Sequence, residues 1–94
     1  MTESGIETHR VIFRGRVQGV GFRWTSNRIA KRFAVTGYVK NLADGTVELV
    51  AHGTSEAVLG LIRAIQESFD AQITDRVDDR VESDEQFDGF EIRR

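Results

Sequence analysis

Apolar and polar residues alternate early in the chain in the manner of a half-buried β-strand. From His9 to Arg14, mostly apolar odd positions take turns with mostly polar even ones, and this period of two predicts a strand. Four further strands are predicted on the same grounds, over residues 35–42, 46–52 and 71–82 and in a short closing run through Phe87, Phe90 and Ile92. The charged residues of 71–82 indicate an edge strand, where charge deters unwanted pairing.

Two other segments show the longer period of an amphipathic helix. The first places Phe22, Ile29, Ala30 and Phe33 on one stripe, and the second does the same with Val58, Ile62, Ile65 and Phe69. Thr54 and Ser55 supply a hydroxyl cap before the second helix, and Glu56 puts an acid in its first turn. Between the second and third strands, Asp44-Gly45 is a hairpin signal.

The predicted order is β-α-β-β-α-β with a short extra strand at the end. That is the split βαβ, or ferredoxin-like, arrangement of the α+β class, in which two helices cover one face of a mostly antiparallel sheet. A chain of 94 residues is expected to form one domain. Residues 1–7 are polar and aperiodic and are expected to be a flexible tail, which leaves 8–94 as the domain.

Composition narrows the possible classes of function. The chain has no cysteine, so disulfides, thiolate metal sites and thiol catalysis are excluded. No apolar run approaches the length of a membrane span, and the polar start does not resemble a signal peptide. We therefore expect a soluble, cytoplasmic protein without a membrane partner, and a monomer, since no exposed apolar strip stands out.

Charge is unevenly distributed along the chain. The net charge is only −2, which argues against non-specific binding of nucleic acid. Residues 1–47 nevertheless carry +5 and residues 48–94 carry −7. The basic half contains the most glycine-rich stretch of the chain, and this placement suits an anionic ligand.

That stretch reads Gly15-Arg16-Val17-Gln18-Gly19-Val20-Gly21-Phe22-Arg23. A predicted strand enters it and a predicted helix leaves it, so the glycines allow a tight turn whose N–H groups can converge near the positive end of the helix dipole. Arg23 adds a planar, permanently charged fork. These parts predict a phosphate pocket, although neither the Walker sequence nor the dinucleotide fingerprint is present. The alternative is a glycine-rich connection beside a surface arginine.

Three motifs at fixed places on this topology resemble the acylphosphatase family. They are the glycine loop, Gly37-Tyr38-Val39-Lys40-Asn41 followed by Asp44-Gly45-Thr46-Val47-Glu48, and Phe87-Asp88-Gly89-Phe90-Glu91-Ile92-Arg93. The resemblance covers nearly all of the chain from about residue 8. The sequence departs from the family at Ala43 and at Ser68-Phe69-Asp70, where members often carry proline or Gly-Pro.

The resemblance implies a hydrolase that splits the carboxyl–phosphate anhydride bond of acyl phosphates into a carboxylate and inorganic phosphate. It implies Arg23 and Asn41 as the catalytic pair, with no cofactor, no metal, and no partner besides the small-molecule substrate and phosphate. The implied phosphate-binding residues are those of the loop, Arg16, Val17, Gln18, Gly19, Val20, Gly21, Phe22 and Arg23.

The chemistry of these side chains agrees with that implication. We expect Arg23 and the loop N–H groups to stabilise the phosphoryl oxygens in the transition state. Asn41 can orient a water without titrating, and the substrate phosphate could accept the proton of that water. From the residues alone, Asn41 could instead be a turn residue ahead of Asp44-Gly45.

Other polar and aromatic residues are expected to have structural roles. His9 faces the predicted core and should be packed and hydrogen-bonded; His52 is too isolated to indicate a metal site. We favour packing for Trp24 over a place at the pocket mouth, and expect Gln18 to bond the loop's own backbone. Three carboxylates of the fourth strand lack calcium-loop spacing and are expected to form a solvated edge: Asp75, Asp78 and Asp79.

Two functions from other classes are compatible with the topology. An RNA-recognition domain needs aromatic residues on its central strands, whereas the face away from the helices should show Arg10, Ile12 and Arg14 beside Glu48, Val50 and His52. RNA binding is therefore disfavoured. An anion-binding module without turnover would need the loop and Arg23 but not Asn41.

Overall fold

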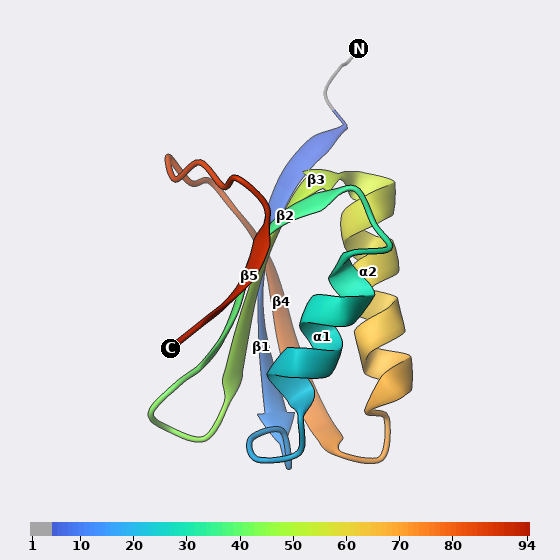
Figure 1. The fold of residues 1–94 in the computed structure, drawn as a ribbon, viewed down its shortest axis with the longest axis vertical. Coiled ribbons are helices and arrows are strands. Elements are labelled where there is room, and N and C mark those ends of the chain that lie inside the picture. The colour runs from blue at the N-terminus through green and yellow to red at the C-terminus, as the bar shows by residue number, and fades with distance from the viewer. Residues whose placement is uncertain (1–4) are drawn as a thin grey trace.

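The computed structural model describes residues 5–94 and shows a five-stranded sheet with two helices on one face (Figure 1). This confirms the predicted ferredoxin-like α+β arrangement and the predicted order of elements. The elements are β1 (Ile6–Gly15), α1 (Phe22–Ala30), β2 (Val35–Asn41), β3 (Val47–Thr54), α2 (Ser55–Ser68), β4 (Ile73–Val81) and β5 (Phe90–Arg93).

The sheet has the strand order β4-β1-β3-β2-β5. Strands β1 and β3 occupy the centre and pair antiparallel with each other and with β4 and β2 respectively. Strand β4 forms one edge, as its charge pattern predicted. The short β5 forms the other edge and runs parallel to β2, so the end of the chain returns beside the strand that carries Asn41.

The first strand begins earlier than its apolar alternation predicts. Ile6 and Glu7, placed in the tail by the sequence, pair with Thr54 and Gly53 of β3. The reason is that β3 is longer than expected, and its backbone supplies ladder partners whatever the side chains are. The rest of the predicted tail falls largely in residues 1–4, which lie outside the described part of the chain.

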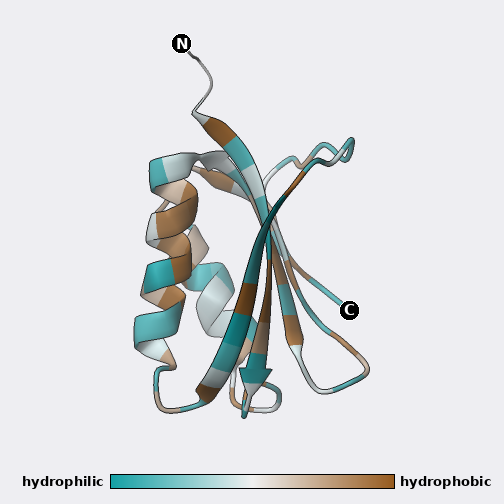
Figure 2. Ribbon diagram, turned by 180° about the vertical axis from the view of Figure 1, so that it is seen from behind, coloured by the Kyte–Doolittle hydropathy of each residue, from teal (hydrophilic) through white to brown (hydrophobic). Residues whose placement is uncertain are grey.

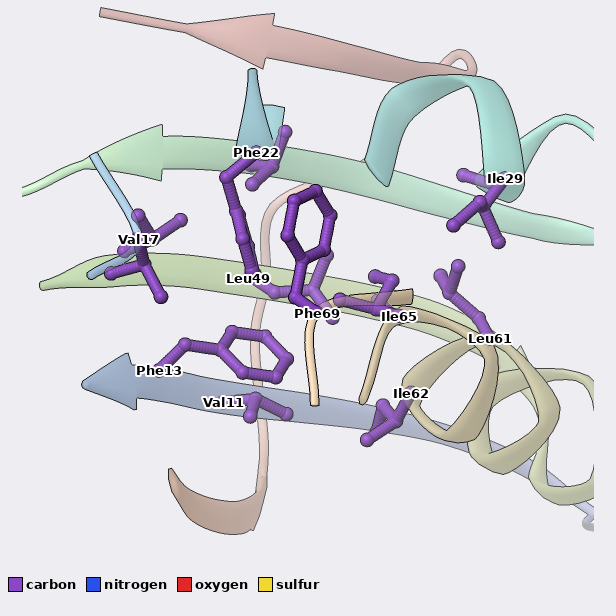
Figure 3. Packing of buried hydrophobic residues seen from close by; sticks show 14 of the residues in the cluster. Val11, Phe13, Val17, Phe22, Ile29, Leu49, Leu61, Ile62, Ile65 and Phe69 are labelled. Atoms are coloured by element: carbon purple, nitrogen blue, oxygen red, sulfur yellow. The ribbon is translucent and has the colours of Figure 1, made fainter. Parts of the chain in front are cut away.

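The core is a single layer between the sheet and the two helices (Figure 3). Both predicted helical stripes enter it, and Figure 2 shows several apolar positions along the ribbon of α2. The predicted cap of α2 is also present, since the Thr54 hydroxyl accepts a hydrogen bond from the N–H of Ala57 at 3.1 Å. The largest fully buried side chains include Phe13, Phe22, Leu49, Leu61 and Ile62.

A change of register divides β4 into two parts. Ile73 pairs with Gly15 and is buried, but the pairing shifts between Arg14 and Gly15. Val77, which is 41% exposed, therefore lies opposite Ile12 on the face of the sheet away from the helices. Sequence alternation cannot reveal such a bulge, because it counts residues on one strand only.

Candidate active site

The loop between β1 and α1 is anchored in the core at both ends. Val17 is completely buried, and Phe22 packs its ring 5.2 Å from that of Phe13 and 4.6 Å from that of Phe69. Figure 3 shows Val17 and Phe22 pointing into the same packed layer. Residues 18–21 between these anchors bow outward toward solvent. The core therefore fixes the position of a loop that contributes few side chains of its own.

The base of the loop is also held by the turn that follows α2. The N–H of Arg16 donates to the carbonyl oxygen of Gln72 at 2.9 Å. Gly15 lies so close to this carbonyl that a Cβ would collide with it, and its φ of +123° also favours glycine. The N–H groups of Gln72 and Ile73 both donate to the carbonyl of Phe69 at 2.9 Å, which makes this proline-free segment a compact turn.

Helix α1 presents an uncapped N-terminus to the loop. Its N-cap is Gly21, at a φ of 77°, and no side chain of residues 5–94 caps the first turn. The N–H of Thr25 is the first to bond within the helix, to the carbonyl of Gly21. The free N–H groups of the first turn and the positive end of the dipole thus face the loop, an arrangement that favours an anion.

The orientation of the Arg23 side chain is fixed by a contact with Arg93, which is distant in sequence. One of its terminal nitrogens donates to the backbone carbonyl of Arg93 in β5 at 3.2 Å. Arg93 is itself fixed by ion pairs with Glu85 and Glu91, and these hydrogen bonds raise the pKa of its guanidinium. Because a guanidinium has five N–H donors, this contact orients Arg23 and leaves further donors for a ligand.

Asn41 ends β2 and faces the same region. Its Oδ1 is buried and accepts no hydrogen bond from the described residues. A pocket of about 330 Å³ brings Asn41 together with Arg23 and parts of the loop. The lining residues are Val17, Gly19, Gly21, Phe22, Arg23, Trp24, Asn41, Ile92 and Arg94. An amide in the same pocket as a guanidinium and a helix N-terminus can position a polar molecule against a bound anion.

Not every residue of the predicted set lines this pocket. The side chains of Arg16 and Val20 are exposed, and Gln18 turns toward the β2–β3 hairpin instead. Figure 1 shows the β1–α1 loop and the β2–β3 turn at the same end of the sheet, away from the N-terminus. The pocket lies where the β1–α1 loop, the end of β2 and the end of β5 approach one another.

Gln18 links the two connections directly. Its amide nitrogen donates to the carbonyl oxygens of Leu42 and Thr46 at 2.8 and 2.9 Å. The prediction that it bonds the loop's own backbone is therefore wrong, because the hairpin lies within reach and offers two carbonyls of its turn. The bridge couples the position of the loop to that of Asn41, which directly precedes Leu42.

We predict that this bridge contributes to stability. Gln18→Met keeps the length of the side chain but removes the donor, and should lower the free energy of unfolding by about 1–2 kcal/mol. Gln18→Glu should cost more, because it points an acceptor at two carbonyl oxygens, and should regain part of the loss as acidification protonates the new carboxyl. Urea unfolding of both variants at two pH values measures this; equal stability of Gln18→Met and the unsubstituted protein would contradict it.

Trp24 and two residues near the C-terminus were not predicted at the pocket. The packing role favoured for Trp24 is wrong, since its side chain is 59% exposed and lines the pocket. Ile92 and Arg94 also line it. Their place follows from the parallel pairing of β5 with β2, in which Ile92 lies beside Val39, and no local pattern predicts such a pairing.

His9 is a buried, hydrogen-bonded residue away from the pocket, as predicted. Its two ring nitrogens lie 2.8 Å from carboxylate oxygens of Glu7 and Asp78. Burial lowers the pKa of His9, but the two carboxylates outweigh it, and the pKa is raised overall from 6.5. The same contact with His9 lowers the pKa of Glu7. Asp78 therefore has a structural partner and is not part of a purely solvated edge.

This histidine should make stability depend on pH. Because its pKa is raised in the folded state, protonated His9 stabilises the fold fully below its unfolded pKa, and the stabilisation is lost as pH rises through the folded value. The free energy of unfolding lost in His9→Gln should thus be larger at about pH 5.5 than at about pH 8.5. Asp78→Asn should reduce the same pH dependence, and a loss independent of pH would contradict the assignment.

The sheet face away from the helices carries a polar and aromatic cluster. Pairing of Ile12 with Glu48 places these residues there as expected, but Tyr38 lies there as well and was not foreseen. Its hydroxyl donates to Glu48 at 3.0 Å, and its ring is covered by the guanidinium of Arg93, 4.1 Å from the ring centre. Burial, followed by the charge of Glu48, raises the pKa of Tyr38. A ring covered in this way is not a free platform for stacking bases.

Within residues 5–94, no group of three or more His, Cys, Asp or Glu side chains could hold a metal ion. In the same range, neither helix is long and apolar enough to cross a membrane.

The glycine loop, the N-terminus of α1, Arg23 and Asn41 thus lie around one pocket on a ferredoxin-like sheet, an arrangement that suits an anionic ligand. The profile of the acylphosphatase family matches residues 9–92. An acylphosphatase of Salinibacter ruber is 44% identical over 81 residues, which is 85% of each chain. An acylphosphatase of Thermococcus kodakarensis is 41% identical over 87 residues, 93% of this chain and 94% of that one.

Comparison of the fold with solved structures points to the same family. The crystal structure of acylphosphatase from Bacillus subtilis superposes with a TM-score of 0.84 at 34% identity, covering 95% of this chain and 99% of that one. The chain therefore belongs to the acylphosphatase family. It is a hydrolase that acts on acid anhydrides, and the family resemblance predicted from its motifs is confirmed.

Proposed function

We propose that the chain hydrolyses acyl phosphates with Arg23 and the backbone of residues 16–22 holding the phosphoryl group and Asn41 orienting the attacking water. One observation carries this assignment of roles: Arg23, the uncapped N-terminus of α1 and Asn41, whose Oδ1 has no partner among the described residues, line one pocket. The positive charge of Arg23 and the N–H donors of the loop can stabilise the phosphoryl oxygens, whereas the neutral amide of Asn41 can accept a hydrogen bond from a water.

The reaction needs charge stabilisation and alignment more than a strong nucleophile, because a carboxylate is a good leaving group. The water oxygen forms a bond to phosphorus while the bond from phosphorus to the carboxyl oxygen breaks. The carboxylate leaves with the electron pair of that bond, and the proton of the water passes to a phosphate oxygen. The products are one carboxylate and one inorganic phosphate.

An isotope experiment tests which atom the water attacks. The purified chain is incubated with an acyl phosphate in ¹⁸O-labelled water with a chelator present, and both products are analysed by mass spectrometry. A phosphoryl-holding site predicts label in the inorganic phosphate. Label in the carboxylate would mean attack at the acyl carbon and would overturn the roles given to Arg23 and Asn41.

The competing assignment is an anion-binding module without turnover. It requires the loop and Arg23 but gives Asn41 no role. Phosphate binding by a folded chain that releases no phosphate from any acyl phosphate would favour that alternative. The presence of Asn41 in the pocket lining favours the enzyme, since a pure anion site gains nothing from the acceptor oxygen of an amide.

A further inference from the structure

The phosphate pocket continues into an apolar wall that the fold does not require. Trp24 is 59% exposed and Ile92 39% exposed, and both line the pocket. Neither belongs to the core cluster. Single exposed apolar side chains are common in proteins. Here, however, two such side chains from different elements line one proposed anion site, so we consider whether they contact the ligand.

The two residues reach the pocket from different elements. Trp24 follows Arg23 in the first turn of α1, and Ile92 lies in β5 beside Val39. Val39 and Asn41 are two residues apart in β2 and so face the same side of the sheet. A molecule whose phosphate reached Arg23 would therefore have both the indole and Ile92 in the same pocket as its leaving group.

Trp24 is held in place on the surface. The guanidinium of Arg28, one helical turn further on, stacks over its ring at 4.9 Å from the centroid. An aromatic ring fixed before the ligand arrives loses little conformational freedom on binding, and this increases what its contact can contribute.

The charges around the pocket restrict the ligand further. The lining holds Arg23 and Arg94 and, within the described chain, no Asp or Glu side chain. It thus offers no acidic side chain to pair with an ammonium group. The volume of about 330 Å³ lies near the lower end for small-molecule sites, which run from about 300 to 1,000 Å³.

We propose that Trp24 and Ile92 form a subsite for the acyl group and make the enzyme selective for acyl phosphates with an uncharged apolar acyl group, aromatic or branched, over acetyl phosphate. This rests on the proposed function, because it takes the phosphate to lie at Arg23 and the loop. Contact with the indole and the isoleucine removes apolar surface of the acyl group from water and strengthens binding of the transition state.

Kinetics with paired substrates test the subsite. The ratio of kcat/KM for benzoyl phosphate to that for acetyl phosphate is measured, so that the intrinsic reactivities of the two substrates cancel between variants. Trp24→Ala should lower this ratio about tenfold, and Ile92→Ala by a smaller factor. Leu59→Ala, which truncates a residue 42% exposed on α2 away from the pocket, should leave it unchanged. An unchanged ratio in Trp24→Ala would overturn the proposal.

A binding measurement separates this proposal from the proposed hydrolysis. Trp24 is the only tryptophan of the chain, so intrinsic fluorescence reports on the subsite. Phenacylphosphonate, in which a methylene replaces the bridging oxygen, should quench it, whereas acetonylphosphonate and inorganic phosphate should bind with little quenching. Equal signals from all three would overturn the subsite even if hydrolysis proceeds. Quenching without any hydrolysis of benzoyl phosphate would instead support the subsite and overturn the proposed function.

Discussion

Arg23→Lys should lower kcat/KM for an acyl phosphate by about a hundredfold or more, despite keeping the positive charge. Lysine offers a single ammonium and cannot donate to the Arg93 carbonyl and to two phosphoryl oxygens with the geometry of a planar fork. Steady-state rates with benzoyl phosphate, together with the inhibition constant of inorganic phosphate, measure the effect. Both should worsen, because the guanidinium is proposed to contact phosphate in the ground state as well as in the transition state.

A matched arginine provides the control for this change. Arg28→Lys alters the other arginine of α1, which stacks on Trp24 but does not line the pocket, and should leave the inhibition constant of phosphate within about twofold. If Arg23→Lys retained wild-type kcat/KM, the bidentate role of Arg23 would be wrong. If Arg28→Lys were as damaging as Arg23→Lys, the loss could not be assigned to a contact between the Arg23 guanidinium and phosphate.

Asn41→Ala should reduce kcat by about a hundredfold or more while the inhibition constant of inorganic phosphate changes little. The separation is expected because Asn41 is proposed to hold the water and not the phosphoryl group. Its amide oxygen has no hydrogen-bond partner among the described residues, so removing the side chain breaks no internal contact of that atom. Single-turnover rates and phosphate competition measure the two parameters separately.

Asn41→Asp tests the effect of a negative charge at the same position. A carboxylate there could still accept a hydrogen bond from water, but its negative charge would repel the phosphate, so phosphate binding should weaken together with kcat. A large loss of phosphate affinity in Asn41→Ala would contradict the separation of roles. Thermal unfolding of both variants verifies that the fold is retained.

The fold could be predicted from the sequence because its elements have clear local periods. Two amphipathic stripes and a set of alternating runs fixed the order of helices and strands, and the hydroxyl of Thr54 marked the start of α2. Local sequence patterns could not predict the register in which the strands pair. The bulge opposite Arg14 and Gly15 and the pairing of β5 with β2 both depend on segments distant in the chain.

The candidate site likewise contains some residues that the sequence predicted correctly and others whose roles it did not predict. Arg23, Asn41 and the glycines belong to short motifs, and the structure brings them to one pocket. The roles of Gln18 and Trp24 were misjudged, because each depends on a neighbour far away in sequence, the β2–β3 turn for one and β5 for the other. The contact between Arg23 and the backbone carbonyl of Arg93 could not be predicted from residue types, since every residue has a carbonyl.

The bond from Arg23 to the carbonyl of Arg93 ties the orientation of the proposed phosphate-binding arginine to an edge strand. Strand β5 has four residues, and within residues 5–94 it pairs with β2 alone. An edge of this size has little of its own to resist fraying. Local opening of β5 would therefore release the guanidinium of Arg23 while the core between the sheet and the two helices stayed packed, and activity would be lost before the protein unfolds.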